Sequence, residues 1–158
     1  MPSEIGFCKA LKELDLSNNL IKELPREFVE CSKLQTLTLN GNRLTRMQSS
    51  LVVAMANLEY LYLARNDIGE IEDLGEVGWK QAALRVVDLD RNRLASVPSS
   101  LLKDSKVHNL NLRDNLIKRS QLMKMEGLEE YQARRKQRMD IVVTNNLDVD
   151  YNICGLTS

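Results

Sequence analysis

The chain has 158 residues with 22 basic and 22 acidic side chains, so its formal net charge at pH 7 is zero. This balance argues against nucleic acid or a membrane surface as a partner, and no apolar run is long enough to span a bilayer. The length allows a single domain with a sizeable core. Three cysteines without a cysteine-rich framework, and an N-terminus unlike a signal peptide, predict a cytoplasmic protein.

A pattern of the form LxxLxLxxNxL occurs five times in residues 1–119. The copies begin at Leu11, Leu34, Leu58, Leu84 and Val107, which are 23, 24, 26 and 23 residues apart. Within a copy, leucines two positions apart face the same side of a short strand, and that side becomes the core. A single coil cannot bury this side alone, so the pattern predicts stacked coils whose strands form a parallel sheet.

An asparagine follows the strand in every copy of the pattern. The chain turns away from the sheet at this point and leaves backbone groups without a ladder partner. Because an asparagine side chain both donates and accepts hydrogen bonds, a stacked column of them can pair these groups. We therefore expect all five to lie inside the solenoid: Asn19, Asn42, Asn66, Asn92 and Asn115.

A second apolar set in each coil, such as Leu24 with Phe28, predicts a convex outer wall. Cys8 and Cys31 stand at equivalent positions in this set, 23 residues apart. We expect both to pack there as small hydrophobic side chains. A disulfide or a metal site is the less favoured alternative, because no histidine or third cysteine accompanies them.

The alignment of the repeats places residues 1–10 in the second half of a coil. Stacked repeats need covered ends, yet no recognisable cap precedes the first strand. Missing upstream repeats are the favoured interpretation, and a partner that covers the first strand is the alternative.

These features resemble the leucine-rich repeat superfamily, and the resemblance covers residues 1 to about 119. It implies an α/β fold, a right-handed solenoid with a curved parallel sheet of about five strands on its concave side. The Leu-Pro and Val-Pro pairs after the asparagine turn are similar to those of the short intracellular repeats. That similarity implies extended or 3₁₀ segments on the convex side.

Residues 120–139 are predicted to form a helical cap, either as one helix or as two separated at Gly127. Leu122, Met125 and Leu128 recur at three-residue spacing and would cover the core of the last coil, with Ser120 as the N-cap. The basic run RRKQR is interpreted as a solvated helix end. Its alternative role as a targeting signal leaves a nuclear location possible.

The segments DSKVHNLNLRDNLI and LMKMEGLEEYQARR resemble the small cytosolic family of leucine-rich repeat-containing protein 57. The residues that match the pattern of that family are Asp104, Ser105, Glu126, Gly127, Tyr131 and Arg134. This narrower resemblance implies a cytosolic interaction module.

Residues 140–158 are predicted to form an extended or disordered tail. Apolar residues alternate with polar ones from Leu147 to Ile153, which is a strand signal. Folding back along the solenoid is favoured over strand addition to a partner, because four apolar side chains on one face are costly to leave in water.

Nothing in the sequence predicts catalysis, a metal or a cofactor. His108 is the only histidine, and no nucleophile and acid accompany it at a recognisable spacing. The seven glycines are scattered rather than gathered in a phosphate-binding loop. We therefore do not expect an enzyme.

The concave surface is the predicted binding site, because residues between the strand leucines point into the curve. Tyrosine and arginine are enriched at interface hot spots, although strands also favour tyrosine and threonine for other reasons. The predicted partner-binding residues are Thr36, Thr38, Tyr60, Tyr62, Val86, Asp88, Arg65 and Arg91. The predicted function is a scaffold or adaptor for a protein or peptide, and a regulatory subunit of an intracellular enzyme such as a phosphatase is the alternative. The oligomeric state stays open.

Overall fold

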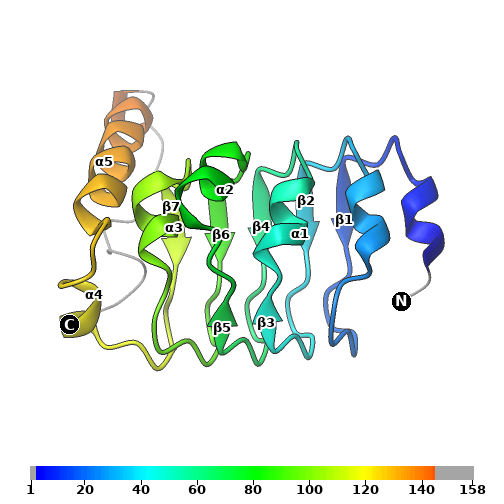
Figure 1. Cartoon of the computed structure of the whole chain (residues 1–158), viewed down its shortest axis with the longest axis horizontal. Coiled ribbons are helices and arrows are strands. Elements are labelled where there is room, and N and C mark those ends of the chain that lie inside the picture. Colours follow the sequence, from blue (N-terminus) through cyan, green and yellow to red (C-terminus); the bar gives the residue numbers. More distant parts are fainter. Residues whose placement is uncertain (1–2, 145–158) are drawn as a thin grey trace.

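The computed structural model describes residues 3–144, which wind into a curved solenoid (Figure 1). Five strands form one parallel sheet in the order β1-β2-β4-β6-β7. Their bounds are Glu13–Asp15 (β1), Thr36–Thr38 (β2), Tyr60–Tyr62 (β4), Val86–Asp88 (β6) and Asn109–Asn111 (β7). Each coil adds one strand beside the last, so the predicted curved parallel sheet of five strands is confirmed.

The apolar residue at the centre of each strand faces the core. Leu37, Leu61 and Leu110 are all buried, and neighbouring strands pair in register at this position. Leu14 and Leu16 in the first coil are only partly buried, because no further strand of the described chain lies beyond β1.

The convex side carries a 3₁₀ segment in the first two coils and an α-helix in the next three. The bounds are Ser3–Phe7 (η1), Arg26–Glu30 (η2), Ser49–Ala54 (α1), Gly75–Gln81 (α2) and Ser99–Asp104 (α3). The expectation of extended or 3₁₀ segments is therefore wrong for the last three coils. The helices α1 and α3 each bury two consecutive apolar side chains, and α2 buries Trp79, whereas η2 buries only Phe28.

A second, two-stranded parallel sheet lies along one edge of the solenoid. It consists of Arg46–Met47 (β3) and Glu70–Ile71 (β5) (Figure 1). The buried side chains of Met47 and Ile71 join the core.

The two cysteines of the convex side differ in their surroundings. Cys31 is buried and its thiol donates to the carbonyl oxygen of Ile5, 3.3 Å away. Burial raises the pKa of the Cys31 thiol. Cys8, however, is exposed, so the expectation that it packs in the apolar wall is wrong. Its coil is the first of the described residues, and no earlier coil covers it.

The asparagine column links each coil to the one before it. Asn66 shows the arrangement: its amide nitrogen donates to the carbonyl oxygens of Leu39 and Leu63, both 3.0 Å away. Its amide oxygen accepts the N–H of Leu44 at 3.1 Å. One side chain thus pairs backbone groups of two consecutive coils, and Asn42 and Asn92 repeat this pattern.

The two ends of this column are less enclosed than its middle. Asn42, Asn66 and Asn92 are buried, and Asn115 is partly buried. Asn19 is exposed and bonds only within its own coil, to the carbonyl oxygens of Leu16 and Ser17. The expectation that all five lie inside is therefore wrong for Asn19, because none of the described residues supplies a coil in front of it.

The C-terminal cap is made of two helices, Arg119–Leu122 (α4) and Leu128–Thr144 (α5), with Gly127 between them at a φ of 86°. Leu122 and Leu128 are buried and Met125 is partly buried against the core. The predicted N-cap Ser120 is wrong, since α4 begins one residue earlier and the side-chain oxygen of Gln121 accepts the N–H of Lys118.

The helix α5 extends to Thr144, beyond the predicted boundary at residue 139. Residues 140–144 are therefore helical rather than extended. The alternating segment from Leu147 onward, which carried the strand prediction, lies outside the described residues, as does Cys154. Within residues 3–144, no helix combines the length and the apolar character needed to cross a bilayer.

Two side chains of α5 pair backbone groups that a further coil would otherwise pair. The hydroxyl oxygen of Tyr131 accepts the N–H of Leu110 in β7, the last strand of the sheet, at 2.9 Å. The guanidinium of Arg134 donates to the carbonyl oxygens of Leu102, Lys103 and Val107, with 3.0 Å to Lys103 and 3.2 Å to Val107. These bonds cap both the sheet and the end of α3.

Close packing explains the glycine between α4 and α5. A Cβ at Gly127 would lie 2.7 Å from the backbone nitrogen of Lys103 and 2.8 Å from the carbonyl oxygen of Ser99. Its positive φ also disfavours other residues. Any larger residue would therefore push α5 away from α3.

Asn66→Ala removes a side chain that pairs one N–H and three carbonyl groups inside the solenoid. We expect a loss of about 1–3 kcal/mol in the free energy of unfolding, because these groups stay buried without partners. Chemical denaturation measures the loss. Asn19→Ala is the matched control, and its effect should be within about 0.5 kcal/mol because the site is exposed. Equal losses in the two variants would contradict the role of the buried column.

Tyr131→Phe keeps the buried ring of the cap and removes the acceptor of the Leu110 N–H. We expect a loss of about 1–2 kcal/mol and faster hydrogen exchange at the amide of Leu110. Tyr60→Phe is the control, since the ring of Tyr60 is exposed on the concave face. Unchanged exchange at Leu110 would show that the hydroxyl does not cap the sheet.

Candidate functional site

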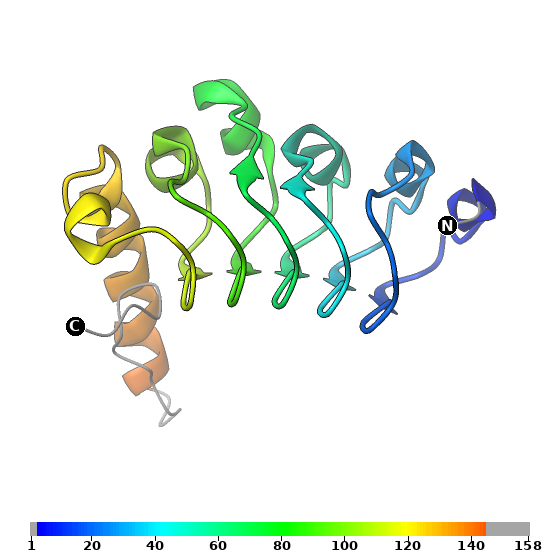
Figure 2. The ribbon, with the colours of Figure 1, turned by 90° about the horizontal axis from the view of Figure 1, so that it is seen from below.

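The concave face of the sheet carries two straight columns of side chains. The strand register aligns Glu13, Thr36, Tyr60, Val86 and Asn109 in one column and Asp15, Thr38, Tyr62, Asp88 and Asn111 in the other. Figure 2 shows the strands on the inner side of the arch and the helices on its outer side. Six of the eight predicted binding residues therefore lie together on β2, β4 and β6.

The tyrosine pair lies on β4, the middle strand. Tyr60 is 37% exposed and Tyr62 is partly buried. The register places Thr36 and Thr38 on one side of the pair and Val86 and Asp88 on the other. The site thus has a flat apolar centre with hydroxyl groups and a carboxylate around it.

Asp88 has a fixed orientation beside the tyrosines. Its carboxylate accepts the N–H of Asp90 at 3.0 Å, and Asn111 on the next strand accepts the N–H of Arg113 in the same way at 3.1 Å. Burial raises the pKa of Asp88, and the bond from the Asp90 N–H opposes the rise only in part. The carboxylate is therefore partly desolvated, as befits an acceptor for an incoming donor.

Arg65 and Arg91 lie on the loops that follow β4 and β6, at one rim of the concave face. Both have a left-handed backbone, with φ of 56° and 52°. Asn18, Gly41 and Asp114, which favour this conformation, hold the same place in the other coils. Arg91 forms an ion pair with Asp114 at 3.3 Å, whereas no ion pair of Arg65 occurs among residues 3–144. Within that range, Arg65 is thus an unpaired cation at the rim.

The opposite rim holds residues that the repeat pattern did not single out. Arg85 forms an ion pair with Glu59 at 3.2 Å. His108 precedes β7 just as Arg85 precedes β6, so the two residues are neighbours across the sheet. Burial lowers the pKa of His108, and the nearby Arg138, Arg85 and Arg134 lower it further. Arg134 and Arg138 come from α5, so only knowledge of where the cap helix docks could have revealed this surface.

The helix α5 limits the concave face at its C-terminal end. Figure 2 shows it crossing the end of the solenoid and projecting beyond the level of the strands. The predicted site is therefore open along the strands and bounded after β7.

Asp88→Asn tests the desolvated carboxylate. The amide oxygen can still accept the N–H of Asp90, as Asn111 does for Arg113, so the turn should survive. Because the folded-state pKa of Asp88 is raised above 3.8, the charged form costs stability that is fully present above the folded pKa. The cost falls as the pH drops below the folded pKa and is gone only below the unfolded value of 3.8. We expect a higher Tm than wild type at pH 7, with the difference vanishing in acid. Melting curves across pH measure this. Asp15→Asn is the exposed control, since Asp15 accepts the N–H of Ser17 in the same way, and it should not raise the Tm. A lower Tm at pH 7 would contradict the desolvation argument.

Comparison with known proteins supports the interpretation of the repeat. Residues 5–44 match the family model described as leucine rich repeat. The chain is similar to leucine-rich repeats and immunoglobulin-like domains protein 3 of Homo sapiens (30% identity) and to the flightless-1 homolog of Caenorhabditis elegans (33% identity). The alignments cover 70% and 67% of this chain. They cover 10% and 8% of those proteins, so the chain spans only a small part of their length.

Solved structures show the same architecture. A leucine-rich repeat protein of Leptospira interrogans aligns with a TM-score of 0.67 and 26% identity, over 96% of this chain and 34% of that one. An internalin of Listeria monocytogenes aligns with a TM-score of 0.57 and 21% identity, over 80% of this chain and 36% of that one. The repeat, the solenoid and these matches together support the assignment of this chain to the leucine-rich repeat superfamily.

Proposed function

We propose that the concave face binds a protein or peptide and that the chain acts as an interaction scaffold or adaptor, not as an enzyme. The observation that carries this proposal is the tyrosine pair of β4. Leucine-rich repeat proteins in general mediate protein–protein interactions, which agrees with it.

The tyrosine pair supports binding because the fold does not need it. Thr36 and Thr38 on one side, and Asn109 and Asn111 nearer the cap, fill the same columns with smaller polar side chains. Tyr60 and Tyr62 therefore add an amphipathic surface, with apolar rings and hydroxyl groups, at the centre of the sheet. Such central aromatic patches supply most of the binding energy in many interfaces.

The charges around the pair favour a peptide or protein over a small molecule. The guanidinium of Arg65, which forms no ion pair with the described part of the chain, lies on one rim, and the half-buried carboxylate of Asp88 lies beside Tyr62. These groups are spread along β4, β6 and the loop that follows β4 on the curved sheet. A ligand that contacts all of them has to be extended.

The proposal includes the narrower resemblance to the family of leucine-rich repeat-containing protein 57, and with it a cytosolic location. Five of the six matching residues support this, since each of the five has a defined contact. Tyr131 and Arg134 cap backbone groups, Gly127 packs against α3, and Ser105 donates to the carbonyl oxygen of Leu101. Glu126 forms an ion pair with Lys103 at 3.2 Å.

The double variant Tyr60→Ala/Tyr62→Ala tests the proposed function. Its Tm should stay close to that of wild type, because Tyr60 is exposed and Tyr62 is not fully buried. Crosslinking in cells identifies the physiological partner, and calorimetry with purified components then measures the affinity. We expect a loss of at least about 2 kcal/mol, the range of an interface hot spot.

Val77→Ala is the matched control, since this apolar side chain of α2 is 69% exposed on the convex side. It should bind the partner as wild type does. Normal binding by the tyrosine variant would place the interface elsewhere and overturn the proposal.

A further inference from the structure

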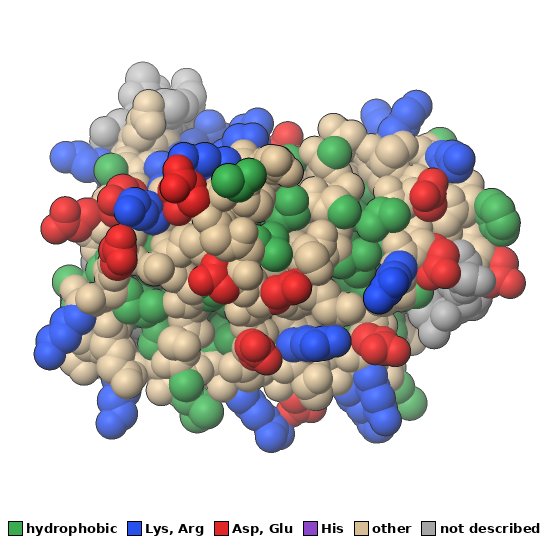
Figure 3. All heavy atoms as spheres, viewed as in Figure 1, with side chains coloured by type: hydrophobic (Ala, Val, Ile, Leu, Met, Phe, Trp, Pro, Cys, Tyr) green, Lys and Arg blue, Asp and Glu red, His purple; other side chains and the backbone are tan. Residues whose placement is uncertain are grey.

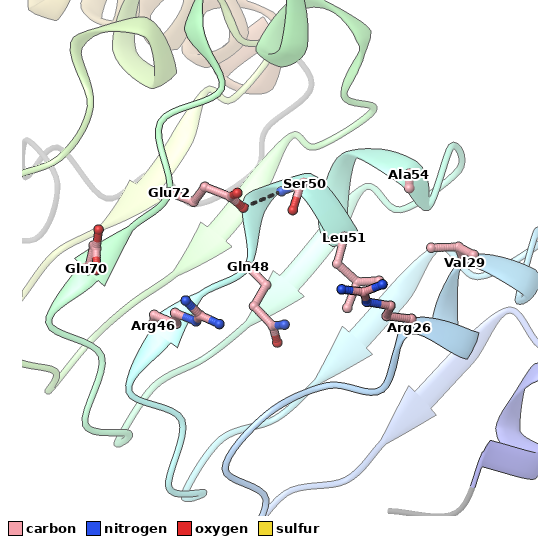
Figure 4. Close-up of a pocket in the computed structure, with 9 residues that line it drawn as sticks. All are labelled: Arg26, Val29, Arg46, Gln48, Ser50, Leu51, Ala54, Glu70 and Glu72. Carbon is pink, nitrogen blue, oxygen red and sulfur yellow. Dashed lines mark hydrogen bonds between the residues drawn. The ribbon is translucent and has the colours of Figure 1, made fainter.

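Besides the concave face, the solenoid exposes a groove on its convex side and an open end at β1. The groove, of about 700 Å³, is lined by residues of η2, β3, α1 and β5 (Figure 4). Guanidinium and carboxylate groups are balanced in its lining, as Arg26, Arg46, Glu70 and Glu72, so its charge does not select a ligand. The open end, by contrast, leaves hydrogen-bonding groups of a defined geometry without partners.

The strand β1 is the free edge of the main sheet. The N–H of Gln35 donates to the carbonyl oxygen of Lys12 at 2.7 Å, and the same bond joins every later pair of coils. The N–H of Lys12 stands at the equivalent position of the first coil, and within residues 3–144 no strand lies beyond β1 to accept it. At the opposite edge, the hydroxyl of Tyr131 already accepts the N–H of Leu110. A further strand can therefore add at β1.

Asn19 has a side-chain oxygen that fits the same added strand. In each later coil, the asparagine oxygen accepts an N–H of the preceding coil, and the amide nitrogen donates to a carbonyl oxygen there. Asn42, for example, accepts from Ile21 and donates to Leu16. Asn19 is exposed and uses only its amide nitrogen, on carbonyl oxygens of its own coil. Its oxygen is thus placed to accept an N–H of a strand beside β1.

The side chains at this end of the solenoid are apolar and incompletely covered. Leu14 and Leu16 are partly buried, whereas Leu37 and Leu39 at the same positions of the second coil are fully buried. Phe7 in η1 is 83% exposed. Apolar side chains are visible at the η1 end of the surface among charged ones (Figure 3). A strand added at β1 would therefore bury apolar surface as well as pair backbone groups.

A segment of the chain outside the described residues has the sequence of such a strand. Residues 147–152 read LDVDYN, and residues 87–92, which run from β6 through its asparagine turn, read VDLDRN. The apolar residues, the two aspartates and the asparagine coincide, and the segments differ in kind only where Tyr151 stands for Arg91. Leu147 and Val149 thus correspond to the strand residues that face the core, and Asn152 corresponds to the asparagine column.

We infer that this tail segment of one copy of the chain adds as a strand, parallel to β1, at the open end of a second copy. In the register of the repeat, Val149 lies beside Leu16. The side-chain oxygen of Asn19 accepts the N–H of Cys154, and its amide nitrogen donates to the carbonyl oxygen of Val149, as Asn42 does with the first coil. The inference goes beyond the proposed function of the concave face and does not rest on it.

The length of the linker requires a second copy as the donor. The helix α5 contacts α3 and lies at the β7 end of the solenoid in both views (Figures 1 and 2). Four strand spacings, about 19 Å, separate β1 from β7. The three residues from Thr144, where α5 ends, to Leu147 span at most about 11 Å. Leu147 therefore cannot lie beside β1 of its own molecule.

One contact in this register is unfavourable. Asp148 lies beside Asp15, whose exposed carboxylate accepts the N–H of Ser17 at 2.8 Å. Like charges opposite each other on neighbouring strands repel. Removal of the charge at position 148 should therefore strengthen the contact, which gives the register a test of its own.

Sedimentation velocity of the whole chain tests the association, with a thiol reductant present to exclude disulfides. We expect the average mass of wild type to rise with concentration, because a head-to-tail contact leaves an edge and a tail free for further copies. Leu147→Asp/Val149→Asp should stay monomeric. Leu156→Asp/Thr157→Asp adds the same two charges outside the LDVDYN segment and should associate as wild type does. A wild-type chain that stays monomeric, or association of Leu147→Asp/Val149→Asp, would overturn the inference.

An NMR titration locates the contact. The blocked peptide TNNLDVDYNISG, residues 144–155 with Cys154→Ser, is added to the Leu147→Asp/Val149→Asp chain, so that the tail of the chain does not compete. We expect shifts of the Lys12 amide and of the Asn19 side chain. Asn19→Ala should bind the peptide about tenfold more weakly, because two hydrogen bonds are lost, while its stability is retained. Unchanged affinity of Asn19→Ala, or shifts confined to other surfaces, sinks the assignment.

Two peptide variants test the register. Asp148→Asn should bind about twofold more tightly, because the repulsion from Asp15 is removed. Asp150→Asn is the matched control, since position 150 lies beside Ser17, and it should bind as the parent peptide does. A gain in affinity cannot arise from misfolding. No gain for Asp148→Asn, or an equal gain for both peptides, would contradict the proposed strand pairing.

The end of the solenoid and the concave site can be tested independently. Tyr60→Ala/Tyr62→Ala should associate as wild type does, because β4 lies two strands away from β1. Loss of association in this variant would show that the tail segment occupies the concave face. That result would overturn the docking at β1 and leave the concave proposal standing.

Discussion

The pairing of backbone groups where each coil leaves the sheet is the constraint on which the whole solenoid depends. A strand of three residues forms only a few backbone hydrogen bonds with its neighbours. The backbone N–H and C=O groups in the rest of the coil therefore need other partners. The amide of Asn66 joins its own coil to the previous one through Leu39, Leu44 and Leu63. Because this bridge repeats at a fixed place, it holds adjacent coils in register. The regular columns of side chains on the concave face follow from that register.

The same constraint governs the C-terminal end of the repeats. Between β7 and Thr144 no further coil supplies acceptors or donors, and the chain changes from repeat to helix. The hydroxyl oxygen of Tyr131 accepts the N–H of Leu110. The guanidinium of Arg134 donates to three carbonyl oxygens, at the end of α3 and just after it. Polar side chains of a single helix thus replace the backbone of a missing neighbour. Burial lowers the pKa of Arg134, which reflects the desolvation that this arrangement costs.

Features that depend on the period of the repeat were predictable from the sequence, and features that depend on neighbours were not. The strands and the alignment of Tyr60 with Val86 follow from spacing alone. The exposure of Cys8 and Asn19 depends on whether another coil covers them. The α-helices of the convex side depend on which side chains have to be buried together, as Leu101 and Leu102 do in α3. The groove lined by residues of η2, β3, α1 and β5 draws on several coils, so no single repeat predicts it.

The helix α5 makes the two ends of the concave surface different, because it lies at the β7 end. A segment that runs across the strands toward β7 meets this helix and has to stop or turn there (Figure 2). In the proposed function, α5 would limit how far such a segment extends past β7. Ligands of different length would share their alignment at β7 and differ in how far they reach toward β1. In the proposed function, His108 and the arginines beside it would then lie next to the end of the segment at β7.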